Sequence, residues 1–506
     1  MSQVVGYTLP AFPGGINLVD PIDRTPDVDA TNLINMYPSG PVLALRKGIS
    51  TSWTAASAAA KTAATLVEAD GTQTMVVACN SNLYKKNGTS STAIKGTTTP
   101  TSDEWQHVTF NNRLYFVNGL DTAQVWTGTG NFADSDFTGV TLADLINVSA
   151  YKARLYFVEK DSGSLWYGNT NAVGASALTE FDVSYIFNLG GFVVSCGSYT
   201  DNLGQNTQDL FYILSSEGEL LFYSGSYPGD SAWTLVARYV IGKPLGYRAQ
   251  VRVENDLWFI TDRGIVPTSI LFSAMGSAAA NSVSRKINPE IVDTAKEFTF
   301  SYLYSGIYYS GERKVVITIP VTSTSTKQLV YNVETGAWTC EQYAVAGANL
   351  CMSIVDGLLY CGANSGKVYQ MYTGFNDDGS AISYTIEGGF NFFGNRQNYK
   401  VFKDIRPIIR TSAGALTIKM DLDTNFQKRR SFATITTPAI GDAATTEWDS
   451  GTWDTDPWSE EERYLFDRYS LRGQGHCGAL RIGGTMIDAL LEFNAFEIRF
   501  EIGSQV

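Results

Sequence analysis

Histidine is scarce in this 506-residue chain, which contains only His107 and His476. A Ser-His-Asp or Cys-His nucleophilic site would have to use one of these two. His107 lies in the alternating stretch EWQHVTF, where we expect a hydrogen-bonded structural histidine. His476 stands beside Cys477, but neighbouring strand residues point to opposite faces, so these side chains are not expected to meet. The G-x-S-x-G, Walker A and H-E-x-x-H patterns are also absent. We therefore predict no catalytic residues and no enzyme.

Metal-binding and disulfide patterns are lacking too. The six cysteines have no C-x-x-C spacing, which argues against a zinc site, and they are too few for a disulfide scaffold. We expect reduced, mostly buried thiols at Cys79, Cys196, Cys340, Cys351, Cys361 and Cys477. The aspartates between Asp20 and Asp29 lack the glycine and the bidentate glutamate of an EF-hand loop, so we interpret them as solvated turn residues. No metal and no cofactor is predicted.

The chain has no excess of positive charge and no long apolar run. Its formal net charge is −13, which disfavours binding that depends on neutralising nucleic-acid phosphates. An acidic charge would suit the wall of a channel through which DNA must slide without sticking. There is no charged leader followed by an apolar segment and no run of about 18 apolar residues. We therefore expect assembly in a cytoplasm without membrane insertion.

A strand–turn–strand unit recurs through the first three quarters of the sequence. Its clearest copy is Asn111–Gly128, where an apolar run, the turn formers Asn118 and Gly119, and a second β-prone run follow one another. The copies lie roughly 40 to 58 residues apart, the range of β-propeller blades. The other copies are Thr74–Gly88, Lys152–Asn169, Gln208–Ser226, Asn255–Ser269, Arg313–Thr339 and Asp356–Gly374. The sequence thus predicts an all-β fold with a propeller of about six to eight blades at residues 51–380.

The remaining parts of the chain differ from the repeat. Residues 1–50 are rich in proline and paired glycine, which predicts an extended arm packed on the β domains. Ser282–Glu297 is the one predicted helix, with Asn288 as its cap and Pro289 in the first turn. Residues 381–506 alternate apolar and polar positions without the blade turn, which predicts a β-sandwich-like platform domain.

The densest aromatic and acidic stretch is WDSGTWDTDPW, followed by a local group of arginines. Tryptophan is enriched at the energetic centres of interfaces, so the stretch is a candidate docking or subunit-interface surface. Its residues are Trp448, Trp453, Trp458, Arg463 and Arg468. The alternative is a loop that closes the edge of the sandwich. The nearby opposite charges predict ion pairs, either within the domain or between subunits.

Three stretches carry a resemblance to a known family. The stretches are DATNLINMYPSG…LALRKGI (Asp29–Ile49), the run from NPEIVD through ERKVVITIP to LVYNVETGAWT, and the final RYSLRGQGHCGALRI…FEIRFE. They resemble the tail-hub or nozzle proteins of short-tailed bacteriophages. These are also called packaged-DNA stabilisation proteins. The likeness is one of order and texture over nearly the whole chain.

The resemblance implies a structural virion protein of the tail. It implies six copies forming a tube below the tail adaptor protein, with tail-fibre or needle and plug proteins as further partners. Viral DNA would pass through the tube without sticking, so we expect the loops that line its lumen to be acidic or neutral. The family has no catalytic residues to carry over. Two alternatives stay open: a glycan- or receptor-binding propeller of the virion, and a propeller glycosidase using two of the many carboxylates.

Overall fold

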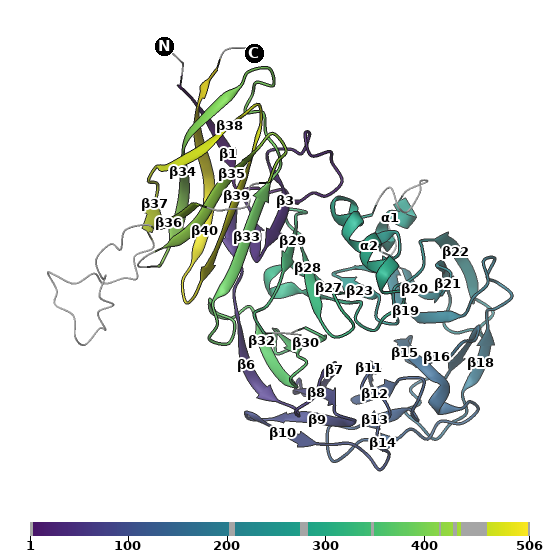
Figure 1. Ribbon diagram of the computed structural model, residues 1–506. Helices are drawn as coiled ribbons and strands as arrows, with labels where there is room; N and C mark the ends of the chain where they lie inside the picture. Colours follow the sequence, from purple (N-terminus) through teal and green to yellow (C-terminus); the bar gives the residue numbers. More distant parts are fainter. Residues whose placement is uncertain are drawn as a thin grey trace. The chain divides into compact units, whose positions relative to one another are not determined.

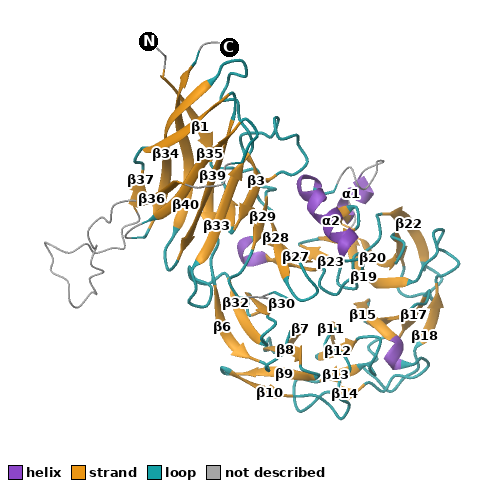
Figure 2. Ribbon diagram, in the orientation of Figure 1, coloured by secondary structure: helices purple, strands orange, loops and turns teal. Residues whose placement is uncertain are grey.

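The computed structural model describes residues 4–201, 208–273, 282–345, 349–413, 416–428, 433–436 and 463–503. Strands dominate, and helices are few and short (Figures 1 and 2). The chain forms two compact units. Unit 1 contains residues 1–50, 329–345 and 372–506, and unit 2 contains residues 51–328 and 346–371. The all-β prediction is confirmed.

Unit 2 is a β-propeller. Within the described residues, six separate sheets act as blades, and antiparallel strand pairs build them. The first four blades have four strands each. In chain order these are β7 (Ala60–Val67), β8 (Gln73–Cys79), β9 (Asn82–Asn87), β10 (Ser90–Ala93); β11 (Gln106–Phe110), β12 (Arg113–Val117), β13 (Gln124–Trp126), β14 (Ala133–Asp134); β15 (Leu145–Tyr151), β16 (Arg154–Glu159), β17 (Ser164–Tyr167), β18 (Thr179–Asp182); and β19 (Val193–Asp201), β20 (Gln208–Ser215), β21 (Glu219–Ser224), β22 (Thr234–Val240).

The remaining blades vary this plan. One blade has three strands, β23 (Gln250–Val253), β24 (Asp256–Thr261) and β25 (Gly264–Pro267). Another combines β30 (Cys351–Val355), β31 (Leu358–Gly362) and β32 (Lys367–Met371) with β6 (Ile49–Thr54). Because β6 precedes the first blade in sequence, it fastens the end of the ring to its beginning. Between these two blades, β26 (Ser305–Tyr309) pairs with β27 (Lys314–Pro320).

The first strands of the six blades, together with β26, form the inner ring. Strand β7 contacts β11, β11 contacts β15, and β15 contacts β19; β23 contacts β26, β26 contacts β30, and β30 returns to β7. Apolar clusters fill the spaces between neighbouring blades, as with Trp105, Phe116 and Trp126 between the first and second. The propeller with about six to eight blades is confirmed.

The repeat unit has a clear local cause. In its clearest copy, Asn118 Oδ1 accepts hydrogen bonds from the amides of Leu120 and Asp121, and Gly119 has a φ of 70°. This turn links β12 to β13. A second turn, at Asn111 and Asn112, has φ values of 46° and 56° and joins β11 to β12 as a two-residue hairpin. Asparagine tolerates this left-handed conformation, which matches the twist of the flanking strands.

Helices are minor elements of unit 2. The predicted helix is present as α2 (Asn288–Glu297), with Pro289 in its first turn. Asn288 is already helical and does not cap it, because its side-chain oxygen accepts a hydrogen bond from Ser284 Oγ at 2.6 Å. The sequence prediction missed α1 (Thr268–Ser273). Short 3-10 turns occur at Leu142–Asp144, Arg285–Ile287 and Ser310–Glu312.

Unit 1 is a β-sandwich, as predicted for the platform. One sheet has the order β37-β34-β40-β5-β4, with β1 also paired to β40 and β38 to β34. In the other, the part within this unit has the order β29-β3-β33-β39-β35-β36, with β2 beside β3. Tyr384 of β33 and Phe493 of β40 meet between the sheets with ring centroids 6.2 Å apart. The strands are β1 (Val4–Pro10), β2 (Gly15–Ile16), β3 (Asp29–Ile34), β4 (Met36–Ser39), β5 (Val42–Leu45), β29 (Trp338–Glu341), β33 (Ile382–Gly388), β34 (Lys400–Thr411), β35 (Thr417–Thr424), β36 (Ala433–Thr436), β37 (Arg463–Leu465), β38 (Tyr469–Gly475), β39 (Gly478–Met486) and β40 (Leu491–Ile502). Strand β28 (Thr326–Asn332) includes the boundary between the units.

The division of the chain differs from the predicted contiguous segments 1–50, 51–380 and 381–506. Residues 1–50 are built into the sandwich: β1 pairs with β40 over seven residues, and β3 pairs with both β29 and β33. Residues 329–345 join the same unit. The reason is that proline-rich segments with short β-prone runs can satisfy their backbone groups by pairing with strands distant in sequence.

A buried ion pair joins the three segments of unit 1. Arg46 and Asp377 make two hydrogen bonds of 2.8 and 2.7 Å, and their side chains are 0% and 1% exposed. Arg46 Nε also donates to Asn35 Oδ1 at 2.8 Å, and Nη2 donates to the carbonyl of Gln342. The guanidinium lies 4.0 Å from the ring centre of Tyr343. Every segment of the unit therefore contributes to one polar cluster.

Removing Arg46 should destabilise unit 1 strongly. Arg46→Ala leaves the Asp377 carboxylate buried without its charge partner, which costs about 3–5 kcal/mol. The matched control is Arg24→Ala. The Arg24 side chain is 74% exposed, and its ion pair with Asp23 is a long one, with 3.8 Å between Nε and Oδ2. Its effect should be below about 1 kcal/mol. The measurement is the free energy of unfolding in urea, and equal losses in the two variants would contradict this account of Arg46.

Candidate functional site

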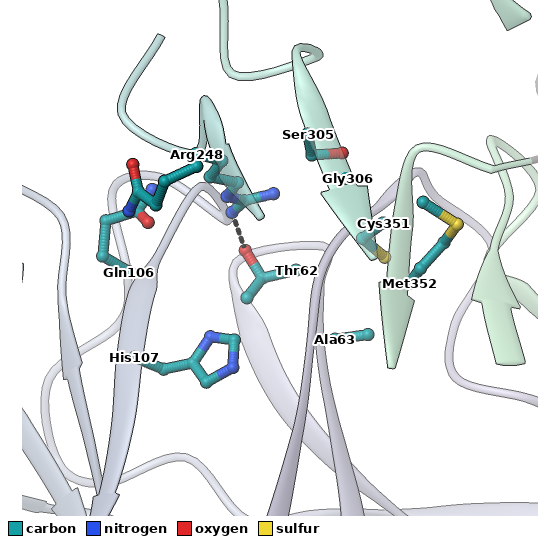
Figure 3. A pocket seen from close by; sticks show the side chains of 10 residues that line it. Thr62, Ala63, Gln106, His107, Arg248, Ser305, Gly306, Cys351 and Met352 are labelled. Carbon is teal, nitrogen blue, oxygen red and sulfur yellow. Dashed lines mark hydrogen bonds between the residues drawn. The ribbon is translucent and has the colours of Figure 1, made fainter. Parts of the chain in front are cut away.

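The central channel of the propeller is the candidate functional site. Two cavities of about 180 and 340 Å³ lie along it and share the lining residues Gln106, His107 and Gln250. Because β7, β11, β15, β19, β23, β26 and β30 surround the channel, the inward positions of these strands supply its lining. Figure 3 shows Arg248, His107, Ser305 and Cys351 around the smaller cavity.

Arg248 reaches across the ring at one end of the channel. It lies in the turn before β23, yet its guanidinium donates to the Lys61 carbonyl at 2.8 Å, to Thr62 Oγ1 at 2.6 Å and to the Trp105 carbonyl at 2.8 Å. These acceptors belong to β7 and to the residue before β11. Desolvation lowers the pKa of Arg248, and Coulombic effects, first of Cys351 and then of Glu104, only partly oppose this. Glu104 is itself hydrogen bonded to Lys61.

The charge of the channel is positive. Arg252 lines the larger cavity and donates to the carbonyl and the hydroxyl of Ser198 at 2.7 and 3.1 Å. No aspartate or glutamate is among the described residues that line either cavity. Both arginines therefore have neutral hydrogen-bond acceptors only, and Glu104 acts on Arg248 without a hydrogen bond to it.

His107 corrects the prediction of a hydrogen-bonded structural histidine. Strand β11 is innermost in its blade, so the side chain faces the channel, and no side-chain hydrogen bond joins it to the described residues. Its ring contacts Phe116 edge-on, with centroids 5.8 Å apart. Desolvation by the surrounding protein, followed by the charge of Arg248, lowers the pKa of His107 to about 4. The lowered pKa keeps His107 neutral near pH 7, although its side chain is exposed within the channel.

The cysteines are free and buried, as predicted. Cys196 and Cys351 lie beside the channel, but burial raises the pKa of each thiol to about 12. Because the thiolate is the reactive form, neither residue is activated as a nucleophile. Cys477 is buried while its neighbour His476 is exposed, so this pair has its side chains on opposite sides, as expected.

The predicted docking patch is only partly visible. Trp448, Trp453 and Trp458 lie outside the described residues. Arg463 begins β37, where it is paired with Thr411 of β34. Arg468 forms ion pairs with Asp404 at 2.9 Å and with Glu497 at 3.4 Å inside unit 1. The structure therefore gives Arg468 an intramolecular role, and the docking role of the patch stays a prediction.

The described part of the chain also bears on metal sites and membrane spans. No group of three or more His, Cys, Asp or Glu side chains there is arranged to hold a metal ion. Of the aspartates between Asp20 and Asp29, Asp20 is exposed, as expected, whereas Asp29 is 2% exposed and accepts a hydrogen bond from Asn17. No described helix has the length and apolar character needed to cross a membrane.

The two-histidine composition makes His107 easy to test. We expect its ring signals in a proton NMR titration to report a pKa near 4, well below the ordinary 6.5, and His107→Asn identifies them by their loss. The unfolded chain would bind this proton first, so the His107 contribution should lower stability as the pH falls from 6.5 towards 4. A His107 signal that titrates near 6.5 would show that the channel is open to bulk water.

Comparison with known proteins yields only structural similarities. No protein-family model and no curated protein matches the sequence. The extracellular domain of the putative one-component system BT4673 from B. thetaiotaomicron has a TM-score of 0.44 and 11% identity, and the match covers 65% of this chain and 40% of that one. The computationally designed Ika8 protein has a TM-score of 0.36 and 11% identity, with 65% and 99% covered. YCF48 bound to D1 peptide has a TM-score of 0.36 and 10% identity, with 67% and 97% covered. The chain thus spans less than half of the BT4673 domain, and these similarities concern the fold alone.

Proposed function

We propose that the chain is a non-enzymatic structural protein of a virion, one subunit of the ring that forms the tail nozzle of a short-tailed bacteriophage. One observation carries the proposal: two of the stretches that resemble the tail-nozzle family lie together in unit 1. Residues 29–49 provide β3, β4 and β5, and the C-terminal stretch provides β39 and β40. Strand β5 pairs with β40, and β3 and β39 both pair with β33. Stretches from the two ends of the chain therefore build one platform.

The channel lining gives no support to the glycosidase alternative. Glycoside hydrolysis generally needs two carboxyl groups on either side of the scissile bond. The described residues that line the channel include none. Together with the raised pKa of Cys196 and Cys351, this leaves the channel without a recognisable nucleophile or acid–base pair.

The net charge of −13 suits a conduit for DNA. Like charges on the wall and on the phosphate backbone prevent the adhesion that would stall a passing genome. In this proposal the tube lies between subunits, below the tail adaptor, and fibre or plug proteins close its far end. The positive channel inside each propeller is a separate feature and does not carry the genome.

Native mass spectrometry of the purified full-length protein tests the proposal. We expect a closed homo-oligomer of six subunits. Arg24→Ala, an exposed substitution, serves as the control that should leave the number of subunits unchanged. A stable monomer or trimer at micromolar concentration would contradict the nozzle and favour a receptor-binding propeller of the virion.

A further inference from the structure

The channel of the propeller has the chemistry of an anion-binding site. Arg248, Arg252 and His107 border two cavities that share three lining residues. Arg248 and Arg252 make hydrogen bonds only to neutral acceptors. The Arg248 guanidinium is desolvated and is hydrogen bonded to no carboxylate, so it gains most from an anion that supplies the missing charge.

Arg248 is held in place for such an anion. Three of its five N–H donors are committed to Lys61, Thr62 and Trp105, so the group is fixed while two donors remain. Arginine that is already ordered loses little side-chain entropy on binding a ligand, and charge-assisted hydrogen bonds are the strong ones. The nearby Glu104 does not compete, because it is engaged by Lys61 at 2.9 Å.

Polar atoms without partners surround the same space. Gln250 Oε1 and Ser305 Oγ are buried and have no hydrogen-bond partner among the described residues. Ser305 can donate its hydroxyl, and the Gln250 amide can present its NH₂ group after a flip. The neutral His107 offers one further ring N–H. Buried polar atoms are normally satisfied, so a ligand in this space would complete their hydrogen bonding.

We propose that the central channel of the propeller binds an oxyanion, a phosphate or a carboxylate, which contacts Arg248 and is attracted further by Arg252. The anion is either a free inorganic ion or the acidic group of a sugar. The site is independent of the nozzle proposal, because it lies inside a single propeller and needs no second subunit. A protein that binds no anion could still form the proposed oligomeric ring.

Isothermal titration calorimetry of the full chain tests the proposal. The probes are inorganic phosphate, glucuronate and, as a neutral control, glucose. We expect wild type to bind at least one of the two anions and not glucose. Binding of phosphate alone indicates a free ion, and binding of glucuronate indicates an acidic sugar. No heat from either anion, or equal binding of glucose, would overturn the proposal.

Variants locate the site. Arg248→Gln should weaken anion binding by about tenfold or more, because a charge-assisted contact is lost. Arg252 makes fewer internal contacts than Arg248. Arg252→Gln should weaken binding by at least about threefold, because the electrostatic attraction of the anion by Arg252 is lost. Arg238→Gln, on the outer strand β22, is the matched control and should bind as wild type does. If Arg248→Gln fails to fold, as judged by circular dichroism, Arg252→Gln decides: wild-type affinity in that variant would refute the site.

Discussion

The buried pair of Arg46 and Asp377 is the constraint on which the architecture of unit 1 depends. It lies where segments separated by 331 positions in the sequence meet, and Asn35, Gln342 and Tyr343 complete its surroundings. Desolvating two charges is expensive, and the cost is offset only when the geometry is bidentate and the remaining donors are satisfied. The chain meets both conditions, so the three segments must come together in one register.

The propeller is held together by different means. Its blades pack through apolar and aromatic faces, as in the cluster of Tyr151, Tyr156, Phe211 and Leu221 between two successive blades. Polar side chains are directed towards the channel, where the inner strands cannot bury them against a neighbouring blade. The repeat unit is therefore scaffold, and the proposed anion site uses inward-facing residues that differ from blade to blade.

Much of this fold could be predicted from the sequence, because its signals are local. The apolar runs on either side of Asn118-Gly119, and their copies elsewhere, predicted pairs of strands. The asparagine side chain and the glycine backbone specify the turn between them. The division of the chain could not be predicted in the same way. Residues 1–50 show short β-prone runs and prolines, but nothing local shows that β1 and β5 pair with β40.

The buried ion pair of unit 1 and the candidate site in the channel were harder to find than the fold. Arg46 stands just after β5 and Asp377 just before a turn, and only the tertiary structure shows that they meet. For Arg248 and His107 a signal did exist: both lie at or just before the first strand of a blade, the position that borders a propeller channel. The tryptophans of the predicted docking patch lie outside the described residues, so their role is still a prediction.

The central claim is that this propeller and sandwich serve as one subunit of a ring-shaped conduit. Single-particle electron microscopy of the purified full-length protein, averaged without imposed symmetry, tests that claim most directly. The account predicts closed rings with sixfold rotational symmetry and an open lumen between subunits. Isolated propellers, or assemblies without a common lumen, would contradict it.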